Sequence, residues 1–173
     1  MICALTGTPG TGKTAVAALL TRRGYHTVDL SAYAREHGFI SGRDEARATD
    51  EVDVEALSRS LRLDAKMAFL VGHFAHRLPA NAVIVLRCRP SVLRTRLEAR
   101  GWPPAKVREN VEAEAIDLIT QESARRSPRV YEVDTTGLTP EQATGEVLGI
   151  LMGDTQGHEA GSVDWSAEVM SWY

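Results

Sequence analysis

Eight residues near the start of the chain constrain its fold more than any other stretch. Residues 7–14 read Gly-Thr-Pro-Gly-Thr-Gly-Lys-Thr and match the phosphate-loop pattern G-x-x-x-x-G-K-[ST] at every fixed position. An apolar run, residues 1–6, precedes them, and a helix-forming run, residues 15–20, follows. The glycines let backbone N–H groups wrap a polyphosphate, and the N-terminus of a following helix favours its negative charge. This strand–loop–helix order predicts that the chain binds a nucleoside triphosphate.

Two side chains of this motif have defined chemical roles. Lys13 is placed to reach the β- and γ-phosphates, and the hydroxyl of Thr14 is placed to bind Mg²⁺. The motif therefore predicts ATP, or another triphosphate, and Mg²⁺ as the bound groups.

The composition is that of an ordinary globular protein. The chain has 173 residues, of which 43% are hydrophobic and 25% charged, enough for one domain with a sizeable core. A net charge of −3 gives no bulk electrostatic reason to expect nucleic-acid or membrane binding. Cys3 and Cys88 each fall in an apolar run, so we expect buried thiols. No run has transmembrane length and the motif at residue 7 leaves no room for a signal peptide, so we expect a soluble, cytoplasmic protein.

Strand and helix patterns alternate along the chain. Strands are expected at residues 1–6, 25–30, 66–71, 82–88 and 129–133, and helices at 13–23, 32–37, 54–63, 90–100, 105–126 and 139–152. This alternation predicts an α/β fold: a parallel, right-handed, doubly wound sheet of five strands with flanking helices. By analogy with nucleoside-monophosphate kinases, we expect the strand order 2-3-1-4-5. Ser31 is expected to cap the helix at 32–37, and Asp53 the helix at 54–63.

Polar residues follow two of the expected strands at the edge where such sheets bind ligands. Asp29 ends the second strand, and two interpretations stay open: it holds a Mg²⁺-bound water, or it caps a helix. His73 follows the third strand, where a polar role beside the γ-phosphate is plausible. His76 lies three residues further on, but no third ligand lies nearby in the sequence, which disfavours a zinc or iron site.

Two charged stretches suit moving parts of a phosphoryl-transfer enzyme. Residues 39–52 carry both signs of charge and are expected to form a mobile substrate flap, or else a solvated loop. Arg96 and Arg100 share one helix face before a turn at residues 101–104, and they are expected to close over the transferring group as a lid. The alternative is that these arginines only solvate their helix. The tail, residues 153–173, ends in aromatic residues that we expect to dock on the body or on a partner.

Several short runs of the sequence together resemble one known family. The runs are the phosphate loop, Ala-Arg-Glu at 34–36, Gly-His-Phe-Ala-His at 72–76, Arg-Leu-Glu-Ala-Arg-Gly-Trp at 96–102, Lys106, and Glu-Asn-Val-Glu-Ala-Glu at 109–114. Over residues 1–152 the chain resembles the adenylate-kinase-like ribosome-assembly ATPases, that is, adenylate kinase isoenzyme six of eukaryotes and its archaeal relatives. The phosphate loop is generic, whereas the runs at 96–102 and 109–114 are more specific, and the 72–76 turn is similar to the archaeal branch.

The resemblance implies an activity and a set of partners. It implies adenylate kinase activity (ATP + AMP ⇌ 2 ADP) with intrinsic ATPase activity. It also implies a role in maturation of the 16S rRNA of the small ribosomal subunit, with a ribosomal protein of the uS11 type and pre-rRNA as partners. Within a kinase domain of residues 1–152, the monophosphate flap would span about residues 30–53 and the lid about residues 99–109.

The resemblance also implies roles for single residues. Arg35 would contact the phosphate of the acceptor nucleotide, Arg100 would contact ATP from the lid, and His73 would be tied to hydrolysis. The residues that would hold the ATP phosphates are Gly10, Gly12, Lys13, Thr14 and Ala15.

One position departs from the family pattern. The family usually has Asp or Glu two residues before the histidine that corresponds to His73, whereas this chain has Val71. A carboxylate there would hold Mg²⁺ through water, so its loss bears on phosphoryl transfer unless Asp29 substitutes. Two alternatives therefore stay open: an ATP-driven ribosome-assembly factor with little kinase activity, and another small-molecule kinase of the shikimate or dephospho-coenzyme A type. The runs at 96–101 and 109–114 disfavour the second of these.

Overall fold

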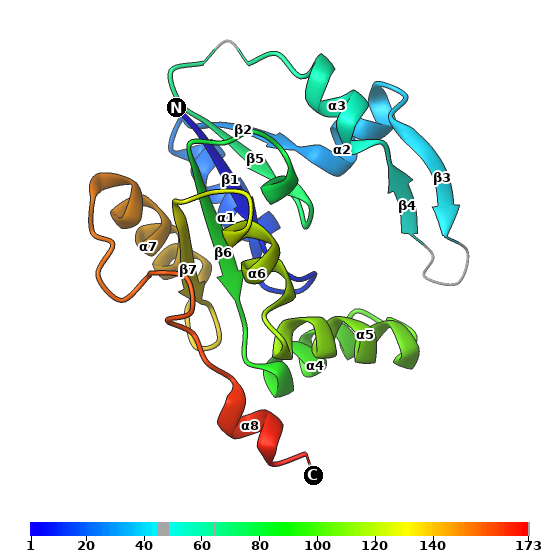
Figure 1. The fold of residues 1–173 in the computed structure, drawn as a ribbon, viewed down its shortest axis with the longest axis vertical. Coiled ribbons are helices and arrows are strands. Elements are labelled where there is room, and N and C mark those ends of the chain that lie inside the picture. Colours follow the sequence, from blue (N-terminus) through cyan, green and yellow to red (C-terminus); the bar gives the residue numbers. More distant parts are fainter. Residues whose placement is uncertain (45–48, 64, 173) are drawn as a thin grey trace.

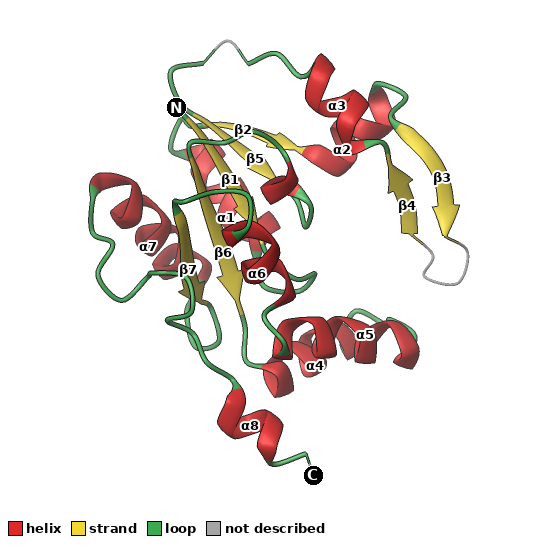
Figure 2. Cartoon of the chain, in the orientation of Figure 1, coloured by secondary structure: helices red, strands yellow, loops and turns green. Residues whose placement is uncertain are grey.

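A five-stranded parallel sheet forms the centre of the molecule (Figures 1 and 2). The structure is a computed structural model that describes residues 1–44, 49–63 and 65–172. The strand order is β2-β5-β1-β6-β7, and each strand pairs in parallel with its neighbours. The strands are β1 (Ile2–Thr6), β2 (His26–Asp29), β5 (Ala68–Val71), β6 (Ala82–Arg87) and β7 (Val130–Asp134). The predicted fold class and strand order are both confirmed.

Helices cover both faces of this sheet, because successive strand residues point to opposite sides. On one face, Cys3 and Leu5 of β1 pack with α1 (Lys13–Arg22) and α7 (Pro140–Met152). On the other face, Ala4 belongs to a cluster with α2 (Leu30–Glu36), α3 (Val54–Ser60) and the 3-10 turn η1 (Ala75–Arg77). Both cysteines are buried free thiols, as the sequence predicts. No helix among the described residues is both long and apolar enough to cross a membrane.

The charged stretch after α2 forms a separate two-stranded hairpin (Figure 1). Its strands β3 (Ile40–Asp44) and β4 (Thr49–Val52) pair in antiparallel fashion beside the main sheet. The sequence analysis expected a flap or a solvated loop at residues 39–52 and did not predict these strands, because two short polar strands give little apolar alternation. Residues 45–48 of the expected flap lie outside the described residues.

Three helices follow β6 where the sequence predicted two. They are α4 (Pro90–Glu98), α5 (Pro104–Ala115) and α6 (Leu118–Ala124), so the expected single helix over 105–126 was wrong. The break lies at Asp117, which has a left-handed backbone with φ of 55°. Its carboxylate forms an ion pair with Arg87, and this tertiary contact accounts for a conformation that is unusual for a residue other than glycine.

The C-terminal tail packs along the free edge of β7 and then runs to the lower end of the sheet (Figure 1). The backbone N–H of Glu132 donates to the carbonyl oxygen of His158 at 2.7 Å, and the last short helix, α8 (Ser166–Met170), follows. Trp165 is only 7% exposed, which confirms that an aromatic residue of the tail docks on the body. Trp172 is 41% exposed, and Tyr173 lies outside the described residues.

Candidate active site

The phosphate loop connects β1 to α1 in a conformation that depends on glycine. Gly7 has φ of 137°, and a Cβ added there would lie 2.3 Å from the carbonyl oxygen of Leu86. Gly10 has φ of 99°, and its Cβ would lie 2.7 Å from the side chain of Leu93 on α4. Residues with a side chain would clash at both positions, so the loop can approach β6 and α4 only with glycine.

Lys13 reaches back over this loop. Its Nζ donates to the carbonyl oxygens of Gly7 at 2.6 Å and Thr8 at 3.0 Å. Burial, together with the positive charge of Arg100, lowers the pKa of Lys13 to about 7, although the carboxylate of Glu114 opposes this shift. Because a triphosphate would bring negative charge to Nζ, its binding would stabilise the charged ammonium.

The residues predicted to hold ATP line one cavity of about 530 Å³. Gly10, Gly12, Lys13, Thr14 and Ala15 form its phosphate-loop side. Three further predicted site residues from separate parts of the chain also line it, namely Asp29, His73 and Arg100. The fold therefore brings together residues that lie as much as 90 positions apart in the chain (from Gly10 to Arg100).

Asp29 lies beside the position where the family pattern expects an acid. It pairs in register with Val71 on the adjacent parallel strand, so both residues stand at the same level of the sheet. Its Oδ1 accepts hydrogen bonds from the backbone N–H groups of Ser31 and Ala32, both at 2.9 Å. Asp29 is thus the N-cap of α2, and the prediction that Ser31 caps this helix was wrong. Capping occupies only Oδ1, and within the described ranges Oδ2 makes no hydrogen bond.

The donor set of this cavity fits a magnesium ion. The hydroxyl of Thr14 and the carboxylate of Asp29 both line it, and Mg²⁺ prefers oxygen ligands and keeps several waters. The side chain of Val71 has no polar atom, so its register partner Asp29 supplies the carboxylate at this level of the sheet. The interpretation of Asp29 as a cap is confirmed, and its role toward Mg²⁺ stays a prediction.

The two histidines after β5 have different surroundings. His73 is exposed and lines the cavity, and loss of hydration together with the nearby positive charge of Lys13 lowers its pKa to about 4, so it is neutral at pH 7. His76 is buried, with Nδ1 3.2 Å from Thr6 Oγ1 and Nε2 2.9 Å from Glu122 Oε2. Sequence reasoning missed this carboxylate partner, and both His76 and Glu122 line the larger cavity described next.

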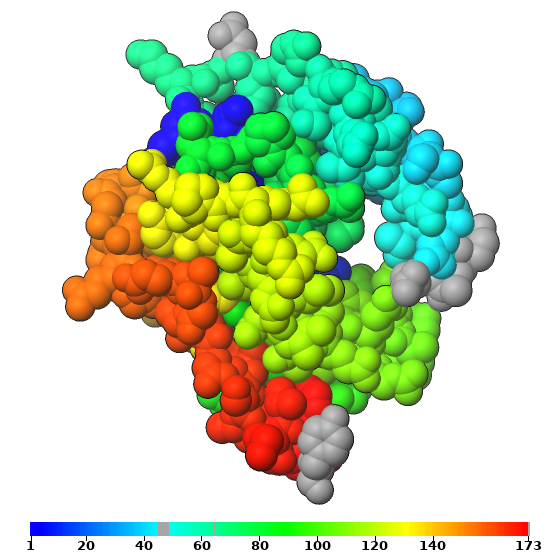
Figure 3. Space-filling view, in the orientation of Figure 1, coloured from blue at the N-terminus to red at the C-terminus, as the bar shows by residue number. Residues whose placement is uncertain are grey.

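A second cavity of about 640 Å³ adjoins the first and shares Pro9, Ser31 and His73 with it. Arg35 lies in its wall, 3.5 Å from Asp50 of the hairpin. Figure 3 shows an opening between the cyan hairpin and the green segments that form the opposite wall. The size suits a mononucleotide, and the contact of Arg35 with an acceptor phosphate stays a prediction.

Lys106 joins the two sides of this second cavity. Its Nζ lies 4.4 Å from the centre of the Trp102 ring and donates to Thr49 Oγ1 on the hairpin at 3.2 Å. Lys106 was not among the predicted site residues. The sequence signal that could have found it is its place in the expected lid, four residues after Trp102.

The two lid arginines lie in different places. Arg100 lines the phosphate-loop cavity, as predicted. Arg96 lines neither cavity, and its guanidinium donates instead to the carbonyl oxygens of Thr135 at 2.9 Å and Thr136 at 3.3 Å. Arg96 would have to leave these acceptors to reach a phosphate, so its role in transfer stays a prediction.

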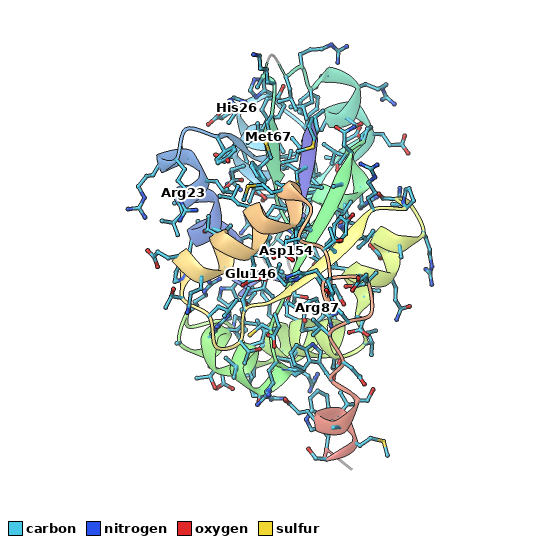
Figure 4. All side chains as sticks on the ribbon, turned by 90° about the vertical axis from the view of Figure 1, so that its left-hand side faces the viewer. Arg23, His26, Met67, Arg87, Glu146 and Asp154 are labelled. Atoms are coloured by element: carbon cyan, nitrogen blue, oxygen red, sulfur yellow. The ribbon has the colours of Figure 1, made fainter. Side chains whose placement is uncertain are left out.

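A buried charge cluster beneath the site was missed entirely. Arg87, at the end of β6, is 1% exposed and pairs with Glu114, Asp117 and Glu132. Burial alone would lower the pKa of Arg87, but the carboxylates of Glu114 and Glu132 hold it above its usual value. Figure 4 shows Arg87 at the lower end of the sheet, near the C-terminal segment. The sequence does contain a signal for this cluster, namely an arginine inside an otherwise apolar strand. A buried charge of this kind is stable only when it is paired.

Comparisons with known proteins agree with this geometry. The AAA-domain family model matches residues 3–117. A protein of Archaeoglobus fulgidus named "Putative adenylate kinase" is 38% identical over 98% of this chain and 94% of its own length. A protein of Methanothermobacter thermautotrophicus with the same name is 42% identical over 96% of this chain and 97% of its own length.

Among solved structures, a gluconokinase from Sinorhizobium meliloti aligns with a TM-score of 0.61 at 18% identity, covering 90% of this chain and 93% of that one. This similarity supports a phosphate-loop kinase fold. The two archaeal sequence matches establish family membership as well as fold, because they extend over nearly the whole chain. The chain belongs to the AAA-domain family and, within it, to the family of these archaeal kinase homologues.

Proposed function

We propose that this enzyme transfers the γ-phosphoryl group of ATP to AMP and forms two molecules of ADP. One observation carries the proposal: a phosphate-loop cavity and an arginine-lined cavity of mononucleotide size meet at Pro9, Ser31 and His73. Two phosphorylated substrates held in such adjoining sites would face each other for direct transfer. AMP is the acceptor that the names of the archaeal relatives support.

The proposed mechanism needs positioning and charge neutralisation more than acid–base chemistry. A phosphate acceptor is already an anionic nucleophile, so no general base is required. Lys13 and Arg100 would stabilise the charge on the transferred group, and Arg35 would orient the acceptor phosphate. His73, neutral at pH 7, could hydrogen-bond at the junction without repelling Mg²⁺. Thr14 and Asp29 would hold Mg²⁺, which would supply positive charge against the negative charge of the triphosphate.

The role of Asp29 toward Mg²⁺ can be tested without losing its cap. Asn is as good an N-cap as Asp, so Asp29→Asn should keep α2 while removing the charge. We expect the Mg²⁺ concentration for half-maximal activity to rise about 10-fold, as for other residues that act on a metal through water. The measurement is a Mg²⁺ titration at fixed ATP. Asp53→Asn is the matched control, because Asp53 caps α3 in the same way and lines neither cavity. If Asp29→Asn and Asp53→Asn needed the same Mg²⁺ concentration for half-maximal activity, Asp29 would have no role toward the metal.

The pKa of Lys13 predicts a difference between two pH profiles. In the free enzyme the ammonium loses its proton as the pH rises through about 7, so kcat/KM for MgATP should fall above that pH. Bound triphosphate raises this pKa again, so kcat at saturating MgATP should hold to higher pH. Steady-state rates measured from about pH 5.5 to about pH 9.5 give both profiles. If kcat/KM and kcat fell over the same alkaline pH range, a group other than Lys13 would control the decline in rate.

A second function remains as an alternative outcome. The sequence resemblance also implies an ATP-driven factor for small-subunit maturation, with a uS11-type protein and pre-rRNA as partners. Two features favour this alternative: Val71 in place of the usual acid, and the aromatic residues of the tail. A kinase for another small molecule is a further alternative, because similar folds serve different acceptors.

The test of the proposal is ADP formation from MgATP by the purified protein, with and without each nucleoside monophosphate. We expect strong stimulation by AMP, with two ADP formed for each ATP consumed. Slow hydrolysis that no monophosphate stimulates would contradict the proposal and favour the assembly ATPase. A pull-down with the ribosomal protein would then follow.

A further inference from the structure

Glu114 connects the phosphate loop to the buried charge cluster. It lies on α5 and is only 2% exposed. Its Oε2 accepts a hydrogen bond from Thr8 Oγ1 at 2.6 Å, which ties it to the phosphate loop. Its Oε1 accepts from Arg87 Nε at 2.7 Å and from the backbone N–H of Cys88 at 3.2 Å. An ionised carboxylate has about four acceptor positions, and a fourth donor completes the set here.

The fourth donor is Trp165 of the C-terminal tail. Its Nε1 lies 3.2 Å from Glu114 Oε1, and its ring lies 5.9 Å from the guanidinium carbon of Arg87. With this contact, the tail, strand β6, helix α5 and the phosphate loop share one buried carboxylate. A fully satisfied buried network is more rigid than a partly satisfied one, so each donor contributes to the orientation of this carboxylate.

The tail has further anchors that place Trp165. Glu132 Oε2 accepts from the backbone N–H groups of Gly161 at 2.9 Å and Val163 at 3.1 Å. On the other side of Trp165, Glu168 Oε1 accepts from the backbone N–H of Ser91, at the start of α4, at 2.7 Å. The tail is therefore fastened on both sides of Trp165, first to the central sheet and then to a helix that leads to Arg100.

The charge of Glu114 also acts on the active site. It raises the pKa of Lys13 against the effect of burial, so the carboxylate supports the ammonium that a triphosphate needs. The position of Thr8 matters for the same lysine, because the carbonyl oxygen of Thr8 accepts from Lys13 Nζ at 3.0 Å. Movement of Glu114 would thus change both the loop and the charge that face the triphosphate.

We propose that Glu114 is a positioning residue for the phosphate loop and that Trp165 of the C-terminal tail holds it in place. The tail, in this view, is part of the ATP site although none of its described residues, 153–172, lines the cavity. The inference rests on the proposed function only in taking a nucleoside triphosphate as the ligand of the phosphate loop. It needs no acceptor, so binding of MgATP alone can test it.

The decisive variant is Trp165→Phe, which removes the N–H donor and keeps an aromatic ring in the buried position. Isothermal titration calorimetry with MgATP should show affinity reduced about threefold to tenfold, less than the full effect of a hydrogen bond to a charged group, because Trp165 acts on the ligand only through Glu114. AMP binding should change less than MgATP binding, because Arg35 and the hairpin lie outside this network and only Thr8 of the network's loop contacts lines the larger cavity. Trp172→Phe is the matched control and should bind MgATP like the parent protein, since Trp172 is 41% exposed and makes no side-chain hydrogen bond in the described part of the chain.

A merely structural role for Trp165 would give a different pattern. It would lower the melting temperature and weaken MgATP and AMP binding equally, and that result would overturn the proposal. Unchanged MgATP affinity in a folded Trp165→Phe protein would overturn it as well. The two proposals can also fail separately. If the parent protein showed no AMP-dependent transfer but Trp165→Phe still lost MgATP affinity selectively, only the proposed function would be wrong.

A double-mutant cycle tests whether Trp165 acts through Glu114. Thr8→Val removes the hydroxyl that donates to Oε2, at the far side of the same carboxylate. If both side chains act by orienting Glu114, the two losses in MgATP affinity should be less than additive in the double variant. Full additivity would show two independent effects and would overturn the proposed connection.

Discussion

Replacing Lys13 with Met is expected to reduce phosphoryl transfer and acceptor-free ATP hydrolysis together, by about 100- to 1,000-fold in kcat. Nζ is the only ammonium on the phosphate loop, and it already contacts the carbonyl oxygens of Gly7 and Thr8. Met keeps much of the chain length and removes the charge, so the change isolates the electrostatic contribution. The measurement is ADP production from MgATP with and without AMP.

A matched control separates this effect from a general loss of positive charge. Lys66 lies in an exposed turn before β5, outside both cavities, so Lys66→Met should leave both rates near those of the parent protein. Thermal melting should show that both variants fold. Unchanged rates in Lys13→Met would contradict the phosphate-loop interpretation of residues 7–14.

The second large effect is expected at Arg35, where the loss should be selective. Arg35→Gln should raise KM for AMP about 10- to 100-fold, the range for one charge-assisted hydrogen bond, with little effect on acceptor-free hydrolysis. The reason is that Arg35 lines the 640 Å³ cavity and is absent from the lining of the phosphate-loop cavity. The comparison of AMP-dependent transfer with AMP-free hydrolysis in one preparation gives the result directly.

Arg59→Gln provides the control for Arg35→Gln. Arg59 is an exposed arginine on α3 that pairs with Glu55 and lines neither active-site cavity. Its replacement should leave KM for AMP unchanged, because a surface ion pair of this kind contributes little. Equal losses of transfer and hydrolysis in Arg35→Gln would mean that the acceptor phosphate binds elsewhere.

The sequence predicted the sheet and the phosphate loop well because both depend on short-range patterns. Apolar runs of strand length alternate with helical runs, and the right-handed crossover rule then leaves few topologies. Strand boundaries moved by up to two residues, as in β5, which begins at Ala68 and not at residue 66. The positions of Lys13, Thr14 and Arg100 at one cavity followed from the motif and from the family resemblance.

Other features could not be predicted, because polar partners distant in the chain decide them. The break at Asp117 depends on Arg87, 30 residues away, and helical spacing alone favoured a continuous helix there. The hairpin was missed since its strands are short and polar, and of the two residues considered as caps, Ser31 and Asp29, it is Asp29 that caps α2. Arg96 was expected at the lid, yet in the structure it contacts the turn after β7.

The sequence by itself therefore determined the fold class and the phosphate loop of this protein, whereas the strand order came from the analogy with nucleoside-monophosphate kinases. The fold class and the loop depend on residues near one another in the chain, where periodicity and backbone geometry act directly. Only the tertiary structure revealed the set of contacts at Glu114, whose partners Thr8 and Trp165 lie 106 and 51 residues from it. A buried carboxylate takes whichever donors the fold brings within about 3 Å, and no local pattern in the sequence specifies which these are.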